Sequence, residues 1–219
     1  MKKEKLDIIY EDKYILVINK KSGLLTIGTD KERENTLYNQ VYTYLKQKHK
    51  SNKVFIVHRL DKDTSGLIIF AKTKEVKYAL QDNWQQVIRK YYAIVNGVVE
   101  KKSDTIKSYL KTTKTNLVYV SNNNEGLLAK TEYRLLKTTN KFSLLDINIL
   151  TGRKNQIRVQ LASIGHNIVG DKLYKDKQFK RLALHAYYLE FIHPITKETV
   201  KLESNYPKEF NNIIQYKKN

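Results

Sequence analysis

Apolar positions along the chain alternate in some segments and follow helical spacing in others. Alternation predicts two strands near the start, over 6–10 and 14–19, separated by a charged turn. Helical spacing predicts amphipathic helices that begin at Thr36 and Thr73, and a third helix over 156–164 that stops at a glycine. The apolar stripe expected for the second helix comprises Val76, Ala79, Leu80, Trp84, Val87 and Ile88. We expect Trp84 to belong to the core.

Further strands are expected in the middle of the chain. Apolar runs over 54–57 and 67–71 bracket a polar segment, and a third apolar run covers 91–95. The dipeptide Asn96-Gly97 follows that run, and both residue types tolerate positive φ. A tight hairpin to a partner strand at 98–99 is therefore predicted.

The second half of the sequence continues to mix strands and helices. Residues 121–126 are polar and predict an exposed loop, which divides the chain into unequal halves. Strands are expected over 142–150 and within 182–202, before a short helix at 207–214. There is no regular βαβ alternation, which favours an α+β fold with a largely antiparallel sheet. We expect one domain over 1–219, with two sub-halves joined near 121–126.

Composition points to the kind of partner. With 41 basic and 22 acidic residues the formal net charge is +19, which favours a polyanion such as nucleic acid. Cysteine is absent, so disulfides and a thiol nucleophile are excluded. The N-terminal residues are charged where a signal peptide is apolar, and no run approaches a membrane span. We expect a cytoplasmic monomer without membrane association.

The densest polar segment is His58-Arg59-Leu60-Asp61-Lys62-Asp63-Thr64-Ser65-Gly66. Positive neighbours favour the ionised form of Asp61, which suits a nucleophile or an electrostatic stabiliser. A turn capped by Asp and Thr explains the same residues equally well. A carboxylate pair of Asp61 and Asp63, as in glycoside hydrolysis, is less favoured because a turn separates the two side chains. No His, Asp or Glu cluster has metal-ligand spacing, so no metal is expected.

Two further segments combine positive charge with chemistry. Arg153, Lys154 and Arg158 surround the expected start of the third helix, where N–H groups and guanidinium groups bind phosphate or carboxylate. Tyr91 and its neighbour Tyr92 follow two basic residues, which suits stacking on an unpaired base. The chain has 16 tyrosines, however, so packing explains any single one of them as well.

Taken together, these segments resemble the RluA-type family of pseudouridine synthases, in the family's order and over nearly the whole chain. Residues 58–66 match His-Arg-Leu-Asp-x-x-Thr-Ser-Gly, and 89–97 resemble the family's tyrosine motif. Residues 150–171 resemble its arginine motif, and 184–194 its closing signature. The resemblance implies a long, bent, mainly antiparallel sheet flanked by helices, with the active site in a central cleft.

The implied reaction converts uridine in RNA to pseudouridine without cofactor or metal. Asp61 is implied as nucleophile or base, Tyr91 as the residue that stacks on uracil and assists with the C5 proton, and Arg158 as the partner of Asp61. Arg59 is implied to fill the space left by a flipped nucleotide, and Leu184 to line the uracil pocket. The other residues expected to contact RNA are His58, Thr64, Arg153 and Lys154.

The sequence also departs from the family pattern. Lys21 stands where proline is common, and Asn155 and Gln160 replace histidines of the arginine motif. The catalytic pattern starts near Ile8, so the small N-terminal RNA-binding domain of many relatives is not expected. The expected substrate is structured RNA, and large-subunit ribosomal RNA is favoured over transfer RNA. A non-catalytic RNA-binding assembly factor and a hydrolase that releases free base are the alternatives.

Overall fold

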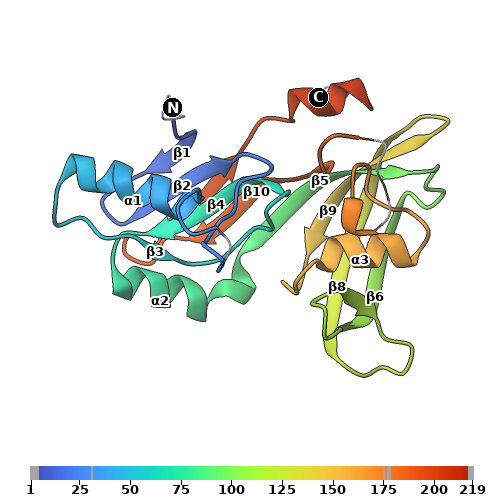
Figure 1. Cartoon of the computed structure of the whole chain (residues 1–219), viewed down its shortest axis with the longest axis horizontal. Coiled ribbons are helices and arrows are strands. Elements are labelled where there is room, and N and C mark those ends of the chain that lie inside the picture. Colours follow the sequence, from blue (N-terminus) through green and yellow to red (C-terminus); the bar gives the residue numbers. More distant parts are fainter. Residues whose placement is uncertain (1–4, 31, 175, 177–178, 217–219) are drawn as a thin grey trace. The chain divides into compact units, whose positions relative to one another are not determined.

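The computed structural model describes residues 5–30, 32–174, 176 and 179–216, and the chain divides into two compact units (Figure 1). The first unit is Met1–Ile88 with Ala186–Ser204, and the second is Arg89–His185 with Asn205–Asn219. The units therefore separate after Ile88. The predicted joint near 121–126 is wrong, because that loop lies within the second unit. That the two units act as one catalytic domain stays a prediction.

The first unit is built on strands in the order β1-β2-β4-β10, with β3 paired to β4 and β11 to β10. Their bounds are β1 Ile8–Glu11, β2 Ile15–Lys20, β3 Phe55–Ile56, β4 Ser65–Ala71, β10 Leu184–Ile192 and β11 Thr199–Glu203. All seven residues of β4 are buried, so both faces of this strand are covered. One face carries Ile15, Val17, Leu67 and Ile69, which pack with Val76 and Leu80 of helix α2.

The two helices of the first unit begin where the sequence predicts. Helix α1 spans Leu37–Lys48 and α2 spans Lys74–Asp82. The hydroxyl of Thr36 accepts from the Asn39 N–H at 3.2 Å, and that of Thr73 from the Val76 N–H at 3.3 Å. These side chains satisfy amide groups that have no partner within the helix, which fixes both starts.

The predicted continuation of the second helix through Ile88 is wrong. Helix α2 ends at Asp82, a 3-10 turn η1 covers Trp84–Gln86, and Ile88 begins strand β5. The Asn83 side chain donates to the Ala79 carbonyl at 2.9 Å, which replaces the next helical bond. Trp84 nevertheless packs against the core, as expected.

Glu11 gives the first unit a pH-dependent interaction. Its carboxylate accepts from Lys48 Nζ at 2.9 Å, Lys72 Nζ at 2.8 Å and the Tyr44 hydroxyl at 2.6 Å. Burial raises the pKa of Glu11, but the hydrogen bonds from Lys48, Lys72 and Tyr44 outweigh burial and lower this pKa to about 2. A lowered pKa means that this stabilisation is complete above the unfolded value of 4.5 and is lost as pH falls towards 2.

We therefore expect the unfolding temperature to fall between about pH 5 and pH 2.5, and to fall less steeply in Glu11→Gln. Thermal unfolding followed by circular dichroism across this range measures both slopes. Glu34→Gln makes the same change at an exposed side chain and should keep the wild-type slope. Equal slopes in wild type and Glu11→Gln would contradict the assignment.

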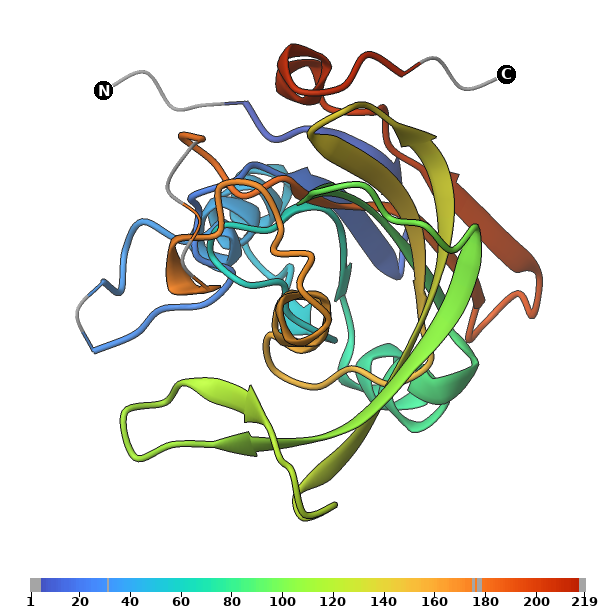
Figure 2. The same ribbon diagram turned by 90° about the vertical axis from the view of Figure 1, so that its right-hand side faces the viewer.

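The second unit is an antiparallel sheet in the order β5-β9-β8-β6-β7, with one main helix, α3 (Figure 2). The bounds are β5 Ile88–Asn96, β6 Ser103–Thr112, β7 Val118–Val120, β8 Leu127–Thr138, β9 Phe142–Ile149 and α3 Gln156–Ser163. Helix α3 contacts β6, β7 and β8, and Val159 packs with Leu110, Val118 and Ala129. The 3-10 turns η2 and η3 cover Lys172–Tyr174 and Lys208–Asn212.

The hairpin predicted at Asn96-Gly97 is wrong. Strand β5 pairs with β9, in the register Val95↔Ser143, and 98–99 form no strand. Gly97 has φ of +82°, as a turn requires, but its N–H donates to the Lys141 carbonyl at 2.8 Å. The strand expected over 142–150, the third helix and the exposed loop are confirmed, except that Ser121 is buried.

Candidate active site

Asp61 lies in the loop between β3 and β4 of the first unit, and the segment 22–26 fixes this loop. The Thr26 hydroxyl donates to the Leu60 carbonyl at 2.8 Å, and the Gly23 N–H donates to the Lys62 carbonyl at 2.9 Å. The Ser22 hydroxyl donates to the Asp63 carbonyl at 2.6 Å. The backbone on both sides of Asp61 is thus held by hydrogen bonds from a segment 34 to 41 residues away in sequence.

A buried lysine strengthens the same arrangement. Lys20 is 1% exposed, and its Nζ donates to the carbonyls of Lys21, Leu24 and Lys62 at 3.1, 2.8 and 2.9 Å. A buried ammonium is stable only when its N–H groups have partners, and three carbonyls supply them. Lys20 therefore connects strand β2 to the loop that carries Asp61. Lys21 departs from the family pattern but contributes its carbonyl, which any residue provides.

The end of this loop requires glycine. Gly66 has φ of +117°, and a Cβ there would lie 2.1 Å from the Ala186 carbonyl oxygen. The Thr64 N–H donates to the Asp61 carbonyl at 3.2 Å, which closes the turn. Thr64 itself is 3% exposed, so its burial gives it a structural part in the turn. Its predicted contact with RNA stays a prediction.

The side chains around Asp61 differ in exposure. Asp61 is half-buried, whereas Arg59 and Asp63 are exposed. His58 accepts from the Ile69 N–H through Nε2 at 3.1 Å, and its ring centroid lies 4.5 Å from that of Trp84. This hydrogen bond requires a His58 Nε2 that has no proton, and it fixes the orientation of the ring. Arg59 is presented to solvent, as its predicted RNA contact requires.

In the second unit, Tyr91 lies on β5, opposite Ile147 of β9, and is 7% exposed. Its neighbour Arg89 is also 7% exposed, and burial lowers the pKa of this guanidinium below its usual range. Arg89 Nη1 lies 3.0 Å from the position that a Cβ on Gly152 would take. A side chain at position 152 would therefore press on the Arg89 guanidinium. Sequence reasoning missed this contact, because Arg89 and Gly152 lie far apart along the chain.

Arg158 forms a buried ion pair within the second unit. Its Nε donates to Asp171 Oδ2 at 2.7 Å and its Nη2 to Asp171 Oδ1 at 2.6 Å, which is a bidentate pair. Asp171 is fully buried and the Arg158 side chain is 8% exposed. Nη1 donates to Asn155 Oδ1 at 3.2 Å. The family resemblance implied Asp61 as the partner of Arg158; that pairing stays a prediction, and Asp171 is a partner that sequence reasoning missed.

The two departures in the arginine motif have structural explanations. Asn155 has φ of +52°, a conformation that asparagine tolerates, and its side chain orients Arg158. Gln160 is fully buried, accepts from the Thr131 hydroxyl at 2.6 Å and donates to Ser108 Oγ at 2.9 Å. A fully paired amide at this position anchors α3 to β6 and β8. Neither residue disturbs Arg158.

The remaining predicted RNA-contacting residues lie in the second unit. Arg153 Nε donates to the Leu128 carbonyl at 3.2 Å, and Lys154 Nζ donates to the Asn116 carbonyl at 3.0 Å. Both side chains are exposed, while Leu184 is 3% exposed at the start of β10. His185 beside it is buried, and burial and the charge of Arg181 lower its pKa to about 3, so it stays neutral.

The described residues contain neither a metal-binding cluster nor a membrane-spanning helix. No three His, Asp or Glu side chains among them gather in a way that would hold a metal ion. Within the same residues, no helix has the length and apolar content needed to cross a bilayer.

Comparison with known proteins gives consistent results. The family model of RNA pseudouridylate synthases matches residues 14–163. The chain is 35% identical over 216 residues to an uncharacterized RNA pseudouridine synthase of Bacillus subtilis, YhcT, covering 96% of this chain and 72% of that protein. It is 32% identical over 229 residues to the ribosomal large subunit pseudouridine synthase D of Zymomonas mobilis, again covering 96% of this chain and 72% of that one.

Solved structures agree in fold. Human RNA pseudouridylate synthase domain containing 4 matches with a TM-score of 0.80 at 24% identity, over 93% of this chain and 90% of that chain. Human RNA pseudouridylate synthase domain containing 1 matches with a TM-score of 0.78 at 24% identity, over 94% and 86%. These likenesses confirm the predicted α+β fold class.

Proposed function

Because this chain belongs to the RNA pseudouridylate synthase family, we propose that it isomerises specific uridines of large-subunit ribosomal RNA to pseudouridine. The relatives named as ribosomal large subunit pseudouridine synthases support this substrate. The net charge of +19 suits a polyanion of that size. The same reaction on transfer RNA is the alternative substrate.

The reaction conserves all atoms of the nucleotide. The bond from N1 of uracil to C1′ of ribose breaks, a bond from C5 to C1′ forms, the proton on C5 leaves and N1 gains one. No oxidant, reductant or leaving group is needed, so side chains that attack and move protons suffice. Asp61 is the proposed nucleophile or base. Tyr91 is proposed to stack on uracil and to assist removal of the C5 proton. Arg158 is the third proposed catalytic residue.

The single observation that carries this assignment is how the Asp61 loop is held. Lys20, Gly23 and Thr26 fix its backbone by hydrogen bonds, while the Asp61 side chain stays half-buried and Arg59 is exposed. A carboxylate on a fixed backbone loses little freedom when substrate binds, which favours reaction at a defined atom. Unstacking a nucleotide costs a few kcal/mol. An exposed arginine beside the carboxylate can fill the space that the flipped nucleotide leaves in the RNA.

Mapping of pseudouridine tests the proposal. Unmodified transcripts of large-subunit ribosomal RNA and of transfer RNA are incubated with the protein, treated with carbodiimide and read by reverse transcriptase. We expect new stops at one or a few uridines of the ribosomal transcript, and none with heat-inactivated protein. Stops in transfer RNA alone would show that transfer RNA, and not ribosomal RNA, is the substrate. Release of free uracil would indicate a hydrolase, and bound but unmodified RNA a non-catalytic assembly factor; either result overturns the proposal.

A further inference from the structure

The sheet of the second unit has one face that α3 covers and one that α3 leaves uncovered. Ser108 of β6 and Thr131 of β8 hydrogen-bond to Gln160 of α3, so both side chains point to the helix. Side chains alternate along a strand, and their sequence neighbours therefore point the other way. We call that other side the outer face of the second unit.

Lysine and tyrosine side chains occupy one end of this outer face, near the turn between β6 and β7. Lys107 lies opposite Lys130, Tyr109 opposite Leu128, and Lys111 opposite Tyr119. Tyr119 is 42% exposed and Lys107 is also exposed. The set is named here the lysine–tyrosine ladder and comprises Lys107, Tyr109, Lys111, Tyr119 and Lys130.

Two lysines of this ladder place like charges opposite each other. Lys107 and Lys130 stand directly opposite, an arrangement in which like charges destabilise a sheet. Among the described residues neither forms an ion pair, whereas Lys111 pairs with Glu125. The nearest carboxylate along β8 on the same face is that of Glu132, and it accepts from Asn148 Nδ2 at 2.9 Å. An external anion between the two lysines would remove the repulsion.

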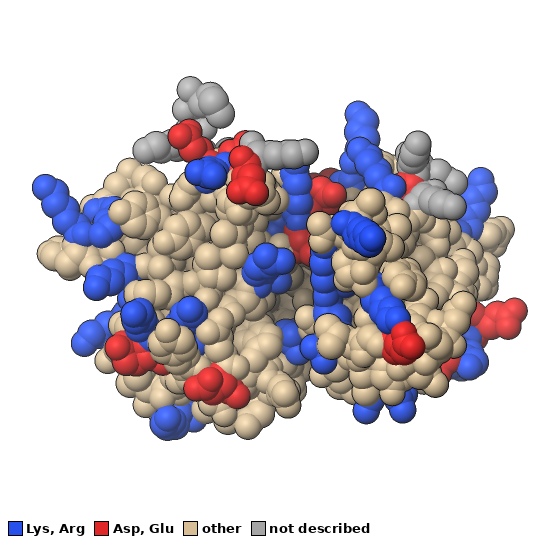
Figure 3. All heavy atoms as spheres, turned by 60° about the horizontal axis from the view of Figure 1, so that its bottom comes forward, with Lys and Arg blue, Asp and Glu red and all other residues tan. Residues whose placement is uncertain are grey.

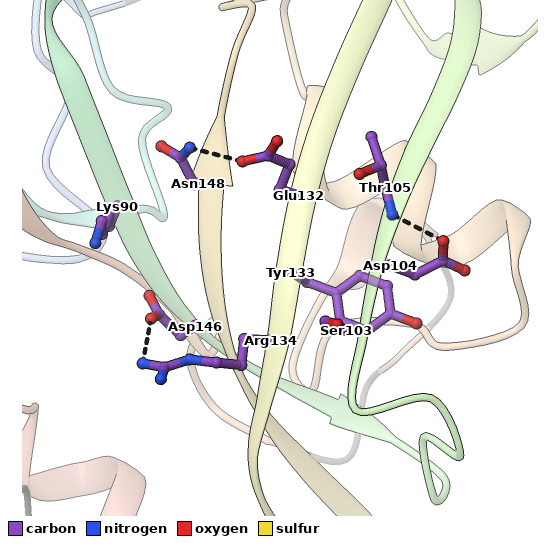
Figure 4. A pocket seen from close by; sticks show the side chains of 9 residues that line it. All are labelled: Lys90, Ser103, Asp104, Thr105, Glu132, Tyr133, Arg134, Asp146 and Asn148. Atoms are coloured by element: carbon purple, nitrogen blue, oxygen red, sulfur yellow. Dashed lines mark hydrogen bonds and ion pairs between the residues drawn. The ribbon is translucent and has the colours of Figure 1, made fainter.

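The rest of the outer face shows the opposite pattern. A hollow of about 400 Å³ lies over β5, β9, β8 and β6, and three of its lining residues are acidic, Asp104, Glu132 and Asp146 (Figure 4). Glu132 bonds to Asn148, and Asp146 accepts from Arg134 Nη2 at 3.1 Å. The lining of the hollow has two cations, Lys90 and Arg134, against the three carboxylates, whereas the ladder has three lysines and no acidic member.

We propose that the lysine–tyrosine ladder is an RNA-binding surface, at which Lys107 and Lys130 contact phosphates and Tyr119 stacks on an unpaired base. Positive charge beside exposed aromatic rings is the combination that binds single-stranded nucleic acid. Lys154, bonded to the Asn116 carbonyl in the adjoining turn, adds charge at the same end. Lys and Arg outnumber Asp and Glu on the surface that Figure 3 shows, in keeping with a polyanionic partner. This inference rests on the proposed function, because it assumes an RNA substrate.

The double variant Lys107→Gln/Lys130→Gln tests the surface. Binding of a large-subunit ribosomal RNA transcript is measured at several salt concentrations. Each phosphate contact contributes about 0.9 to the slope of log affinity against log salt, so the slope should fall by about 1.8. Affinity at 0.1 M salt should fall about 60-fold. Because the variant removes a like-charge pair, its unfolding temperature without RNA should equal or exceed that of wild type.

A matched control separates this surface from general charge. Lys50→Gln/Lys53→Gln removes two exposed lysines of the first unit and should change slope and affinity far less. Equal losses in the two double variants, or no loss in the ladder variant, would overturn the proposal. Tyr119→Ala should weaken binding about tenfold and Tyr119→Phe little, since only the alanine removes the ring. Binding is measured without turnover, so a failure of the ladder and a failure to form pseudouridine are separate results.

Discussion

Replacing Asp61 with asparagine is expected to abolish pseudouridine formation while RNA binding and folding stay near wild type. Asparagine has the same shape but no negative charge, so it neither attacks carbon nor accepts a proton. Loss of acid–base catalysis alone lowers rates by about 10²–10⁴-fold, and loss of a nucleophile by at least as much. The hydrogen bonds that fix the loop are accepted by the backbone carbonyls of Leu60, Lys62 and Asp63, which the substitution leaves in place.

Asp63→Asn is the matched control, because it makes the same change two residues away on the same loop. Its side chain is exposed and has no proposed role, so single-turnover rates should stay within about twofold of wild type. Tritium release from C5-labelled uridine in RNA measures both variants. A residual rate in Asp61→Asn within tenfold of wild type would remove Asp61 from the chemistry. An equal loss in Asp63→Asn would show that the loop, and not the carboxylate, is what the reaction needs.

Local signals in the sequence predicted the positions of most elements. Helix starts at Thr36 and Thr73 depend on a side chain that reaches an amide three residues on, so the sequence alone contains the cause. The strand at 142–149 and the end of α3 before Gly165 are equally local. These predictions needed no knowledge of the rest of the chain.

Errors arose where a distant segment decides the structure. Asn96-Gly97 has the residues of a tight turn, but β5 finds its partner in β9, whose strand begins only at Phe142. The second helix has apolar spacing through Ile88, yet Ile88 belongs to β5 because the sheet requires it there. The same dependence on distant partners explains the division of the chain after Ile88, which no change of composition marks.

The candidate site shows the same difference between residues that local motifs reveal and residues whose role depends on distant contacts. Asp61, Tyr91 and Arg158 were chosen from motifs, because each lies in a short segment with a distinctive order of residues. Lys20 and Asp171 were not assigned roles, because what they do depends on contacts with segments far along the chain. Lys20 reaches the Lys62 carbonyl across 42 residues, and Asp171 meets Arg158 across 13. Residue type and spacing alone do not reveal such partners.

Asp171→Asn is expected to destabilise the second unit by about 3–5 kcal/mol, since it removes the buried carboxylate that holds the Arg158 guanidinium in a bidentate pair. The amide would also turn an N–H group towards the guanidinium, where two donors cannot bond. For a chain of this length the unfolding temperature should fall by roughly 10 °C. Asp104→Asn breaks the exposed pair with Lys101 and should leave this temperature unchanged, because solvent already screens that pair. Thermal unfolding followed by circular dichroism compares the two variants. An unfolding temperature for Asp171→Asn equal to that of wild type would mean that the bidentate pair contributes nothing to the stability of the second unit.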